Sequence, residues 1–212
     1  MLYMPIGALI PTGPTSRHRL GRFVRRGLWW VGGLLLASLA LVGASYLLIQ
    51  RGGNFHAVES GLVYRSAQPG AEALRQAVAT HGIKAVLNLR GGNAGKPWYD
   101  EEVRAARTLG IQHLDLRLSA YHDLSVAQMD DIVKLIQDAP KPLLIHCESG
   151  ADRTGLVSAL YRLSRGQSGA AAAQELAPRY GHVVALVPRS AAMDRSLEAY
   201  LQSGRGPKLA TR

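Results

Sequence analysis

The feature that most constrains this chain is a ten-residue segment at positions 146–155, which reads HCESGADRTG. It contains the only cysteine of the 212 residues and follows an apolar run at positions 143–145. The apolar run predicts a buried strand, and the residues from Thr154 onward predict a helix. A glycine between them allows a tight turn whose N–H groups point inward at the start of that helix. The segment therefore predicts an anion-binding turn that carries a thiol.

The spacing within this turn predicts phosphoryl transfer. Cys147 and Arg153 lie six positions apart, so the guanidinium can fold back over the sulfur and bind two phosphoryl oxygens. The helix N-terminus and Arg153 both favour the thiolate, which makes Cys147 the expected nucleophile. Water would then hydrolyse the cysteinyl-phosphate while Thr154 donates a hydrogen bond to the departing thiolate. The competing interpretation is a buried cysteine that serves only packing.

The turn itself is the expected phosphate site, through backbone N–H groups and the guanidinium. Its members are Glu148, Ser149, Gly150, Ala151, Asp152 and Arg153. We expect His146 to orient the turn through backbone contacts and not to act as a base.

The segment resembles the His-Cys-x5-Arg-Ser/Thr loop of the cysteine-based phosphatases. Residues 63–69 (VYRSAQP) and 82–90 (GIKAVLNLR) extend the likeness to the bacterial dual-specificity, tyrosine phosphatase-like branch, over residues 54–203. The resemblance implies a cysteine-dependent phosphoric monoester hydrolase that needs no cofactor and no metal. It also implies an α/β fold in which a mostly parallel central sheet is flanked by helices, and a general acid before the nucleophile strand.

Three aspartates are candidates for that general acid. Asp123 is preferred, because it lies between a predicted strand and a predicted helix capped by Ser125; it is 24 residues before Cys147. Asp115 lies 32 residues before Cys147, closer to the spacing of the family, but its alternating neighbours place it inside a strand. Asp152 lies within the loop itself, and some related phosphatases active on lipid phosphates carry an aspartate there.

Apolar periodicity and glycine or proline breaks predict the remaining elements. The predicted strands are a pair within 55–65 and single strands at 83–89, 111–118 and 143–145; the predicted helices are 71–80, 100–109, 125–138, 154–165, 169–180 and 189–202. Strands that alternate with helices imply a largely parallel sheet covered on both faces. Residues 91–97 form a loop at a strand's carboxyl end, where Arg90 and Lys96 either contact phosphate or carry solvated surface charges.

A second feature is the uncharged stretch at residues 28–49, which follows Arg25 and Arg26 and ends shortly before Arg51. Its 22 residues match the ~20 needed for a transmembrane helix. A buried core helix and a cleavable signal peptide are the alternatives. The stretch lacks a polar stripe and is longer than the apolar part of a signal peptide, so we expect a single-pass anchor.

Flanking charge predicts the orientation of the anchor. Five arginines, at positions 17, 19, 22, 25 and 26, precede the stretch, so the N-terminus should stay cytoplasmic. The catalytic part would then face the periplasm from a bacterial inner membrane. The predicted organisation is a basic cytoplasmic segment (1–27), a transmembrane helix (28–49), a linker (50–54), a phosphatase domain (55–203) and a flexible tail (204–212).

Composition limits the partners. Of the net charge of +10, residues 1–51 carry +6, and residues 52–212 carry 19 basic against 15 acidic residues. Most of the excess positive charge therefore comes from the arginines that flank the predicted transmembrane helix. No nucleic-acid-binding pattern accompanies it. The seven histidines show no metal-ligand spacing, so no metal is expected. The open alternatives are a phosphatase of phosphorylated proteins, a phosphatase of lipid or other small phosphate esters, and a non-catalytic phosphate-binding module.

Overall fold

The computed structural model describes residues 27–34, 36–44 and 52–204 of the chain. Contacts divide the chain into two units, Met1–Ser45 and Tyr46–Arg212. In the first, the helix Gly27–Ala44 has a mean hydropathy of 1.8 and is long and apolar enough to cross a membrane. A signal sequence near an N-terminus has the same character. Residues 45–49 of the predicted span, the basic segment before residue 27, residues 50–51 of the linker and residues 205–212 lie outside the described residues.

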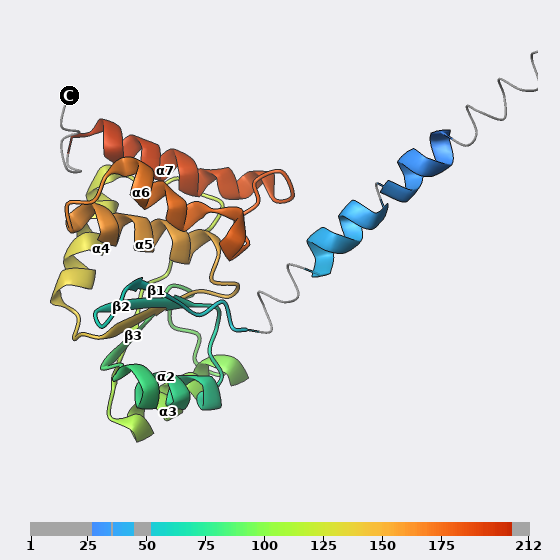
Figure 1. The fold of residues 1–212 in the computed structure, drawn as a ribbon. Coiled ribbons are helices and arrows are strands. Elements are labelled where there is room, and N and C mark those ends of the chain that lie inside the picture. The colour runs from blue at the N-terminus through green and yellow to red at the C-terminus, as the bar shows by residue number, and fades with distance from the viewer. Residues whose placement is uncertain (1–26, 35, 45–51, 205–212) are drawn as a thin grey trace, which may run out of the picture. The chain divides into compact units, whose positions relative to one another are not determined.

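The second unit is built on a five-stranded sheet with the order β1-β2-β5-β3-β4 (Figure 1). Its strands are β1 (His56–Glu59), β2 (Val63–Ser66), β3 (Ala85–Asn88), β4 (Gln112–Asp115) and β5 (Leu143–His146). β1 pairs antiparallel with β2, and the other neighbours pair in parallel. The α/β fold with flanking helices is confirmed, but the sheet is mixed. Three residues that include Gly61, at φ +78°, connect β1 to β2, and so short a connection permits only antiparallel pairing.

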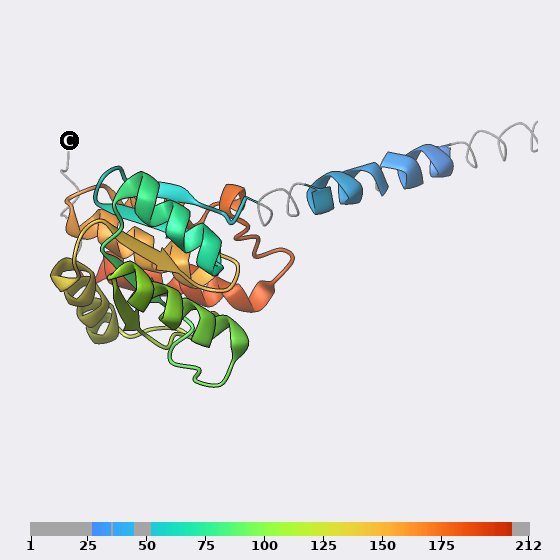
Figure 2. The ribbon, with the colours of Figure 1, turned by 90° about the horizontal axis from the view of Figure 1, so that it is seen from below.

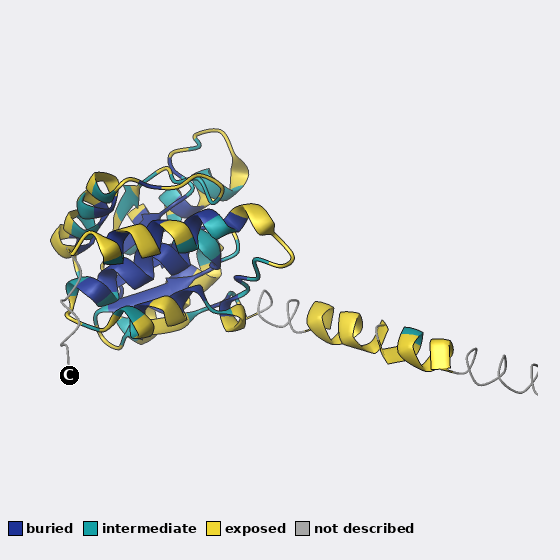
Figure 3. Cartoon of the chain, turned by 90° about the horizontal axis from the view of Figure 1, so that it is seen from above, coloured by how far each residue is buried: buried dark blue, intermediate teal, exposed yellow. Residues whose placement is uncertain are grey.

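Helices cover both faces of this sheet. α2 (Ala71–His81) and α3 (Pro97–Leu109) lie side by side on one face (Figure 2). α4 (Val126–Asp138), α5 (Asp152–Ser164), α6 (Gly169–Ala173) and α7 (Ala191–Gln202) lie on the other (Figure 1). Consecutive residues of the inner strands point to opposite faces and are all buried, so the inner strands and α5 form the centre of the core (Figure 3).

The two faces carry separate apolar clusters. On the α2–α3 side, Leu74 and Ile83 pack with Val86 and Leu144. On the other side, the neighbouring strand residues Leu87 and Ile145 pack with a larger set from α4, α5 and α7 that includes Met129, Ile136, Leu156, Leu160 and Leu197. The strand that precedes the cysteine is therefore buried from both sides, as the sequence predicts.

Several element boundaries differ from the predictions. The predicted helix over 169–180 is wrong: the segment divides into α6 and two single 3₁₀ turns, η1 (Gln174–Leu176) and η2 (Pro178–Tyr180). Ala177 is extended (ψ 154°), because the following proline disfavours helical backbone before it. A third 3₁₀ turn, η3 (Pro188–Ser190), precedes α7.

Two helix starts and one strand end also differ. α3 begins at Pro97, three residues earlier than predicted, because proline suits the first turn of a helix. α5 begins at Asp152. The strand predicted over 111–118 ends at Asp115. The predicted Ser125 cap of α4 is present, as a capping box with Gln128.

The parallel strands bring four connections to one edge of the sheet. The carboxyl ends of β2, β3 and β5 are in register, with Ser66 and Asn88 both opposite His146. Beyond them, the Leu89 N–H donates to the carbonyl of His146 at 2.9 Å, and the Gln68 N–H donates to that of Glu148 at 3.1 Å. Ligand sites of α/β sheets collect at this edge.

Candidate active site

The segment after β5 forms the predicted turn. Cys147 follows the last strand residue and is 1% exposed, and α5 starts five residues later. Within the turn, Gly150 has φ +72°, and a Cβ atom built there would lie 2.6 Å from backbone atoms of Ser66 and Ala67. A glycine is therefore required at this position both for its backbone angle and for the close approach of β2.

Two polar atoms next to the turn lack a hydrogen-bond partner within the described part of the chain. The Nε atom of Arg153 and the Oγ1 atom of Thr154 are buried with no hydrogen-bond partner among the residues that the structure describes. The Nη1 atom of Arg153 lies 3.5 Å from the carbonyl of Leu118. Buried donors without partners are costly, and a bound phosphoryl group would supply acceptors for them.

A cleft of about 510 Å³ lies against this turn. It is lined by Arg117, Leu118, Ser119, Ala120 and Tyr121 from the β4–α4 connection, and by Glu148 and Arg153 from the turn and α5. The lining thus contains two arginines, one glutamate, one serine, one aromatic and two aliphatic residues, and the Nη2 atom of Arg117 donates to the carbonyl of Gly92 at 2.6 Å.

The predicted phosphate-binding residues contribute in different ways. The side chain of Glu148 is exposed, lines the cleft and lies 4.0 Å from Arg90. The carbonyl of Ser149 accepts a hydrogen bond from Asn54 at 3.0 Å. Phosphate binding by the backbone N–H groups of the turn and by the side chain of Arg153 stays a prediction.

Each candidate general acid is engaged with a different partner. Asp123 forms a bidentate ion pair with Arg195, with distances of 2.7 and 3.2 Å, and this pairing lowers the pKa of Asp123. In this conformation Asp123 is ionised at neutral pH and is absent from the lining of the cleft.

Asp115, at the end of β4, accepts hydrogen bonds from Asn88 at 2.8 Å and from the hydroxyl of Tyr99 at 2.5 Å. The latter bond is the main cause that raises the pKa of Tyr99 to about 12. Asp152 binds His182 at 2.6 Å. The structure places none of the three carboxylates against the cleft, and the assignment of the acid stays a prediction.

His146 contacts the backbone of the turn, as expected from the sequence. Its Nδ1 atom lies 3.2 Å from the carbonyl of Cys147, and its Nε2 atom lies 3.0 Å from Glu102. Glu102, on α3, also binds His113 at 2.7 Å and Gln68. Burial, the largest influence, raises the pKa of Glu102, but the bonds from His113 and His146 outweigh it and lower the pKa to about 2. A buried carboxylate thus ties α3 to the catalytic strand.

The chain matches the model of a family described as DSP-PTPase phosphatase fused to NAD+ kinase, over residues 37–187. It belongs to this family of cysteine-based phosphatases. The resemblance seen in the sequence is thereby confirmed, and the protein is a cysteine-dependent phosphatase. No curated protein sequence matches the chain.

Solved structures of similar phosphatases share the fold. TpbA of P. aeruginosa has 23% sequence identity and a TM-score of 0.55, with 73% of this chain and 92% of that chain covered. The catalytic domain of the PP-IP phosphatase SIW14 of S. cerevisiae has 20% identity and a TM-score of 0.53, with 71% and 92% covered. Tk-PTP has 23% identity and a TM-score of 0.52, with 68% and 96% covered.

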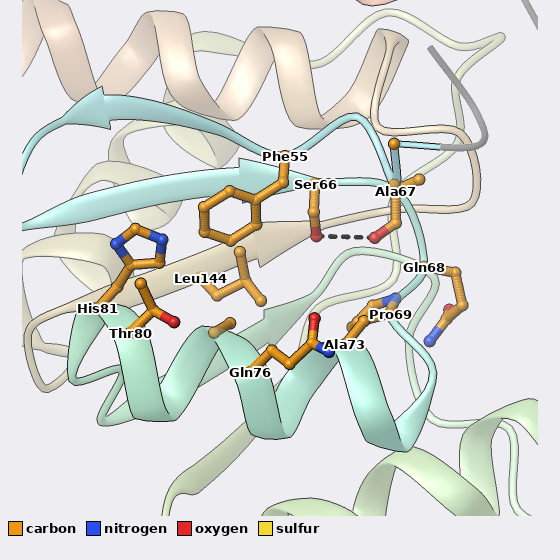
Figure 4. A pocket seen from close by; sticks show the side chains of 13 residues that line it. Phe55, Ser66, Ala67, Gln68, Pro69, Ala73, Gln76, Thr80, His81 and Leu144 are labelled. Carbon is orange, nitrogen blue, oxygen red and sulfur yellow. Dashed lines mark hydrogen bonds between the residues drawn. The ribbon is translucent and has the colours of Figure 1, made fainter. Parts of the chain in front are cut away.

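A second pocket lies behind the phosphatase turn, between β2 and α2 (Figure 4). Its volume is about 260 Å³, and it shares no lining residue with the cleft. Phe55 and His81 stack at 5.0 Å on one side of it, and Gln68 and Pro69 lie on the other. The described residues contain no group of three or more His, Cys, Asp or Glu side chains that could hold a metal ion.

Two buried side chains next to the turn, Arg65 and Glu102, escaped the sequence analysis. Arg65 lies in residues 63–69, which the sequence analysis used only for their likeness to the phosphatase family. Glu102 lies in the predicted helix 100–109. One sequence feature could have identified both residues. Each is an ionisable residue at a position of a strand or helix that faces the core, where a charge needs a partner.

Proposed function

We propose that this protein is a membrane-anchored phosphatase of phosphorylated proteins that works through a cysteinyl-phosphate intermediate. The observation that supports this best is the pair of buried, unpartnered polar atoms of Arg153 and Thr154, on the first turn of the helix that follows Cys147. A phosphoryl group bound there would meet the helix N-terminus, the turn N–H groups and the guanidinium together.

Two displacements at phosphorus make up the proposed reaction. The Cys147 thiolate forms a bond to phosphorus while the bond to the leaving-group oxygen breaks, and a general acid gives that oxygen a proton. Water then attacks phosphorus, releasing inorganic phosphate and the thiolate, to which Thr154 donates a hydrogen bond. Arg153 stabilises the charge on the non-bridging oxygens in both steps.

Variants of the turn test this mechanism in the full-length protein. Cys147→Ser should abolish turnover but keep affinity for inorganic phosphate, because the N–H groups and Arg153 remain. Arg153→Lys should lose at least ~10²-fold in kcat, because a lysine cannot form two parallel bonds to the transition state. Turnover above a few per cent of wild type in Cys147→Ser would rule out the thiol as nucleophile.

The substrate is proposed from the lining of the cleft. Tyr121, Leu118 and Ala120 offer apolar contacts for a phosphorylated side chain. A structure of the similar TpbA was determined in complex with phosphotyrosine. These observations favour phosphotyrosine or phosphoserine/threonine in a protein.

The alternative is a lipid or small-molecule phosphate ester with the same turn. Arg117, the second arginine in the lining of the cleft, favours this alternative, because its guanidinium could exchange its bond to the Gly92 carbonyl for another anionic group. The similar SIW14 is described as a PP-IP phosphatase. Kinetics with phosphotyrosine peptide, phosphoserine peptide, phosphatidic acid and inositol polyphosphates decide between them. Under the alternative, Arg117→Gln raises KM for substrates with several anionic groups and leaves phosphotyrosine unaffected; an equal effect on all favours the protein phosphatase.

The membrane part of the proposal rests on the apolar helix Gly27–Ala44 and on the arginines before it. The N-terminus would be cytoplasmic and the catalytic unit periplasmic, at a bacterial inner membrane. A reporter fused after residue 212 should be active only outside the cytoplasm. Retention of the protein in membranes after alkaline extraction distinguishes an anchor from a cleaved signal peptide.

A further inference from the structure

Arg65 lies in the middle of the sheet directly beneath the phosphatase turn. It is a residue of β2, the strand that pairs with β5, and it is 0% exposed. Its Nη2 atom donates to the carbonyl of Gly150 at 2.7 Å and contacts that of Ala151 at 3.4 Å. Both carbonyls belong to the turn that is expected to bind phosphate.

The guanidinium is itself held in place from three directions. Its Nη1 atom donates to the carbonyl of Glu175 at 2.8 Å and to Oε2 of the same residue at 2.6 Å. The other carboxylate oxygen of Glu175 accepts from Arg162 at 2.5 Å. The ring of Tyr180 lies against the guanidinium, with its centroid 3.8 Å from Cζ. The η1 and η2 turns, which replace the predicted helix, supply Glu175 and Tyr180.

The direction of the carbonyls determines what the turn can bind. Turn N–H groups that point at an anion require the carbonyls to point the other way, into the protein. A carbonyl buried there without a donor would cost free energy, and the turn would relax to recover a partner. Arg65 supplies the donor for the carbonyl of Gly150 and so opposes that relaxation, whereas the carbonyl of Ala151 also accepts from the N–H of Gly155 at 2.8 Å.

The charge of Arg65 also bears on the nucleophile. Burial is the largest influence on Arg65 and lowers its pKa, whereas the charges of Glu175 and Cys147 raise it. Arg65 and Cys147 therefore attract each other when both are charged. Arginine keeps its proton even when buried, which makes this a permanent charge.

We propose that Arg65 is a positioning residue for phosphoryl transfer, which holds the turn carbonyls inward so that the turn N–H groups face the phosphoryl oxygens. The inference rests on the proposed function, in which Cys147 is the nucleophile. The competing possibility is that Arg65 and Glu175 form an ion pair of the core that stabilises the fold and leaves the reaction untouched.

Three full-length variants test this assignment. Arg65→Met with Glu175→Gln removes both charges of the pair, so that neither of these two residues is left as a lone buried charge, while Arg162 keeps its bond to Gln167. Arg65→Lys keeps the charge but loses the fork that reaches Glu175 and the turn together. Arg165→Met is the control, because it removes another arginine–glutamate pair of the same region, between Arg165 at the end of α5 and Glu59, away from the turn.

Activity, competitive inhibition by inorganic phosphate and thermal unfolding are measured for each variant. We expect the double variant to lose ~10- to 10²-fold in kcat and to bind phosphate more weakly. Arg65→Lys should also lose kcat and phosphate affinity, and Arg165→Met should match wild type. Should the double variant fail to fold, Arg65→Lys alone carries the comparison with the control.

Wild-type kinetics in a folded Arg65 variant, or losses no larger than its unfolded fraction, would overturn the assignment. Cys147→Ser in the same assays keeps the two claims separate. Loss of turnover there, together with unaffected Arg65 variants, would refute only the role of Arg65. Full turnover in Cys147→Ser would refute the proposed function itself.

Discussion

The Nδ1 atom of His182 lies 2.6 Å from Oδ1 of Asp152, the residue that begins α5 directly after the catalytic turn. On its other side, Nε2 lies 2.9 Å from Oδ2 of Asp194 in α7. His182 is 3% exposed. Burial, the largest influence, lowers its pKa, but the bonds to the two carboxylates outweigh burial and raise the pKa above 6.5. When protonated, His182 donates to both carboxylates and so connects the turn to α7.

This arrangement predicts a loss of stability as the pH rises. A raised pKa means that folding favours protonation, so the stabilisation is complete below the unfolded value near 6.5 and disappears as the pH passes the folded pKa. His182→Gln should cost about 2 kcal/mol at pH 6, as expected for charge-assisted hydrogen bonds, and progressively less above neutral pH. Thermal unfolding of both proteins from pH 5.5 to 9 measures this. Parallel curves for the two proteins across that range would mean that His182 is not the titrating group.

The general acid is tested by a matched pair of variants. Asp123→Asn and Arg195→Gln both remove the ion pair between these residues, but only the first removes a carboxyl group. If Asp123 is the acid, Asp123→Asn should slow phosphates with poor leaving groups by ~10²- to 10⁴-fold, and good leaving groups much less. Arg195→Gln should keep the rate, because it releases the carboxyl group from the cation that lowers its pKa.

Equal effects of the two variants would make Asp123 a structural residue. Asp115→Asn and Asp152→Asn, measured with the same leaving groups, then identify the acid. Asp152 is bound to His182 and Asp115 to Tyr99, so each would have to exchange that partner for the leaving group.

The features that could be predicted from the sequence are those determined by residues close together in the chain. The turn, its glycine and the helix after it follow from ten consecutive residues, and the Ser125 cap follows from Gln128 three positions on. The helix over 169–180 failed although its alanines favour helix, because Pro178 fixes the residue before it in an extended conformation.

The buried ion pairs and hydrogen bonds next to the turn join residues that are distant in sequence. Arg65 and Glu175 are 110 positions apart, and Glu102 and His146 are 44 apart. One sequence shows neither pairing, because each joins a strand residue to an element far away in the chain, η1 for Arg65 and α3 for His146. The engagement of Asp123 by Arg195, 72 positions away, was hidden for the same reason.

Glu102 predicts sensitivity to acid. Its pKa of about 2 lies below the ordinary 4.5, so the stabilisation it provides is present above pH 4.5 and is lost as the pH falls toward 2. This shift corresponds to roughly 3 kcal/mol. Glu102→Gln should lower stability at neutral pH and flatten the acid unfolding profile between pH 4.5 and 2. Urea unfolding at a series of pH values checks this, and an unchanged acid transition would assign the acid sensitivity to other carboxylates.

Alanine variants of Gly150 and Gly166 distinguish the effect of backbone strain from that of a steric clash at the turn. Both have positive φ, +72° and +80°, so alanine at either position costs about 1–2 kcal/mol for the left-handed backbone. A Cβ atom at Gly166 meets nothing within 4 Å, whereas one at Gly150 would collide with the backbone of Ser66 and Ala67. Gly166→Ala should therefore lose that stability and keep its kcat. Gly150→Ala should lose more stability, and also phosphate affinity and at least ~10-fold in kcat, because the turn must move away from β2 and from the carbonyl contact with Arg65. Thermal unfolding and phosphate inhibition of the two variants give the comparison, and equal behaviour of both would show that the turn tolerates displacement from β2.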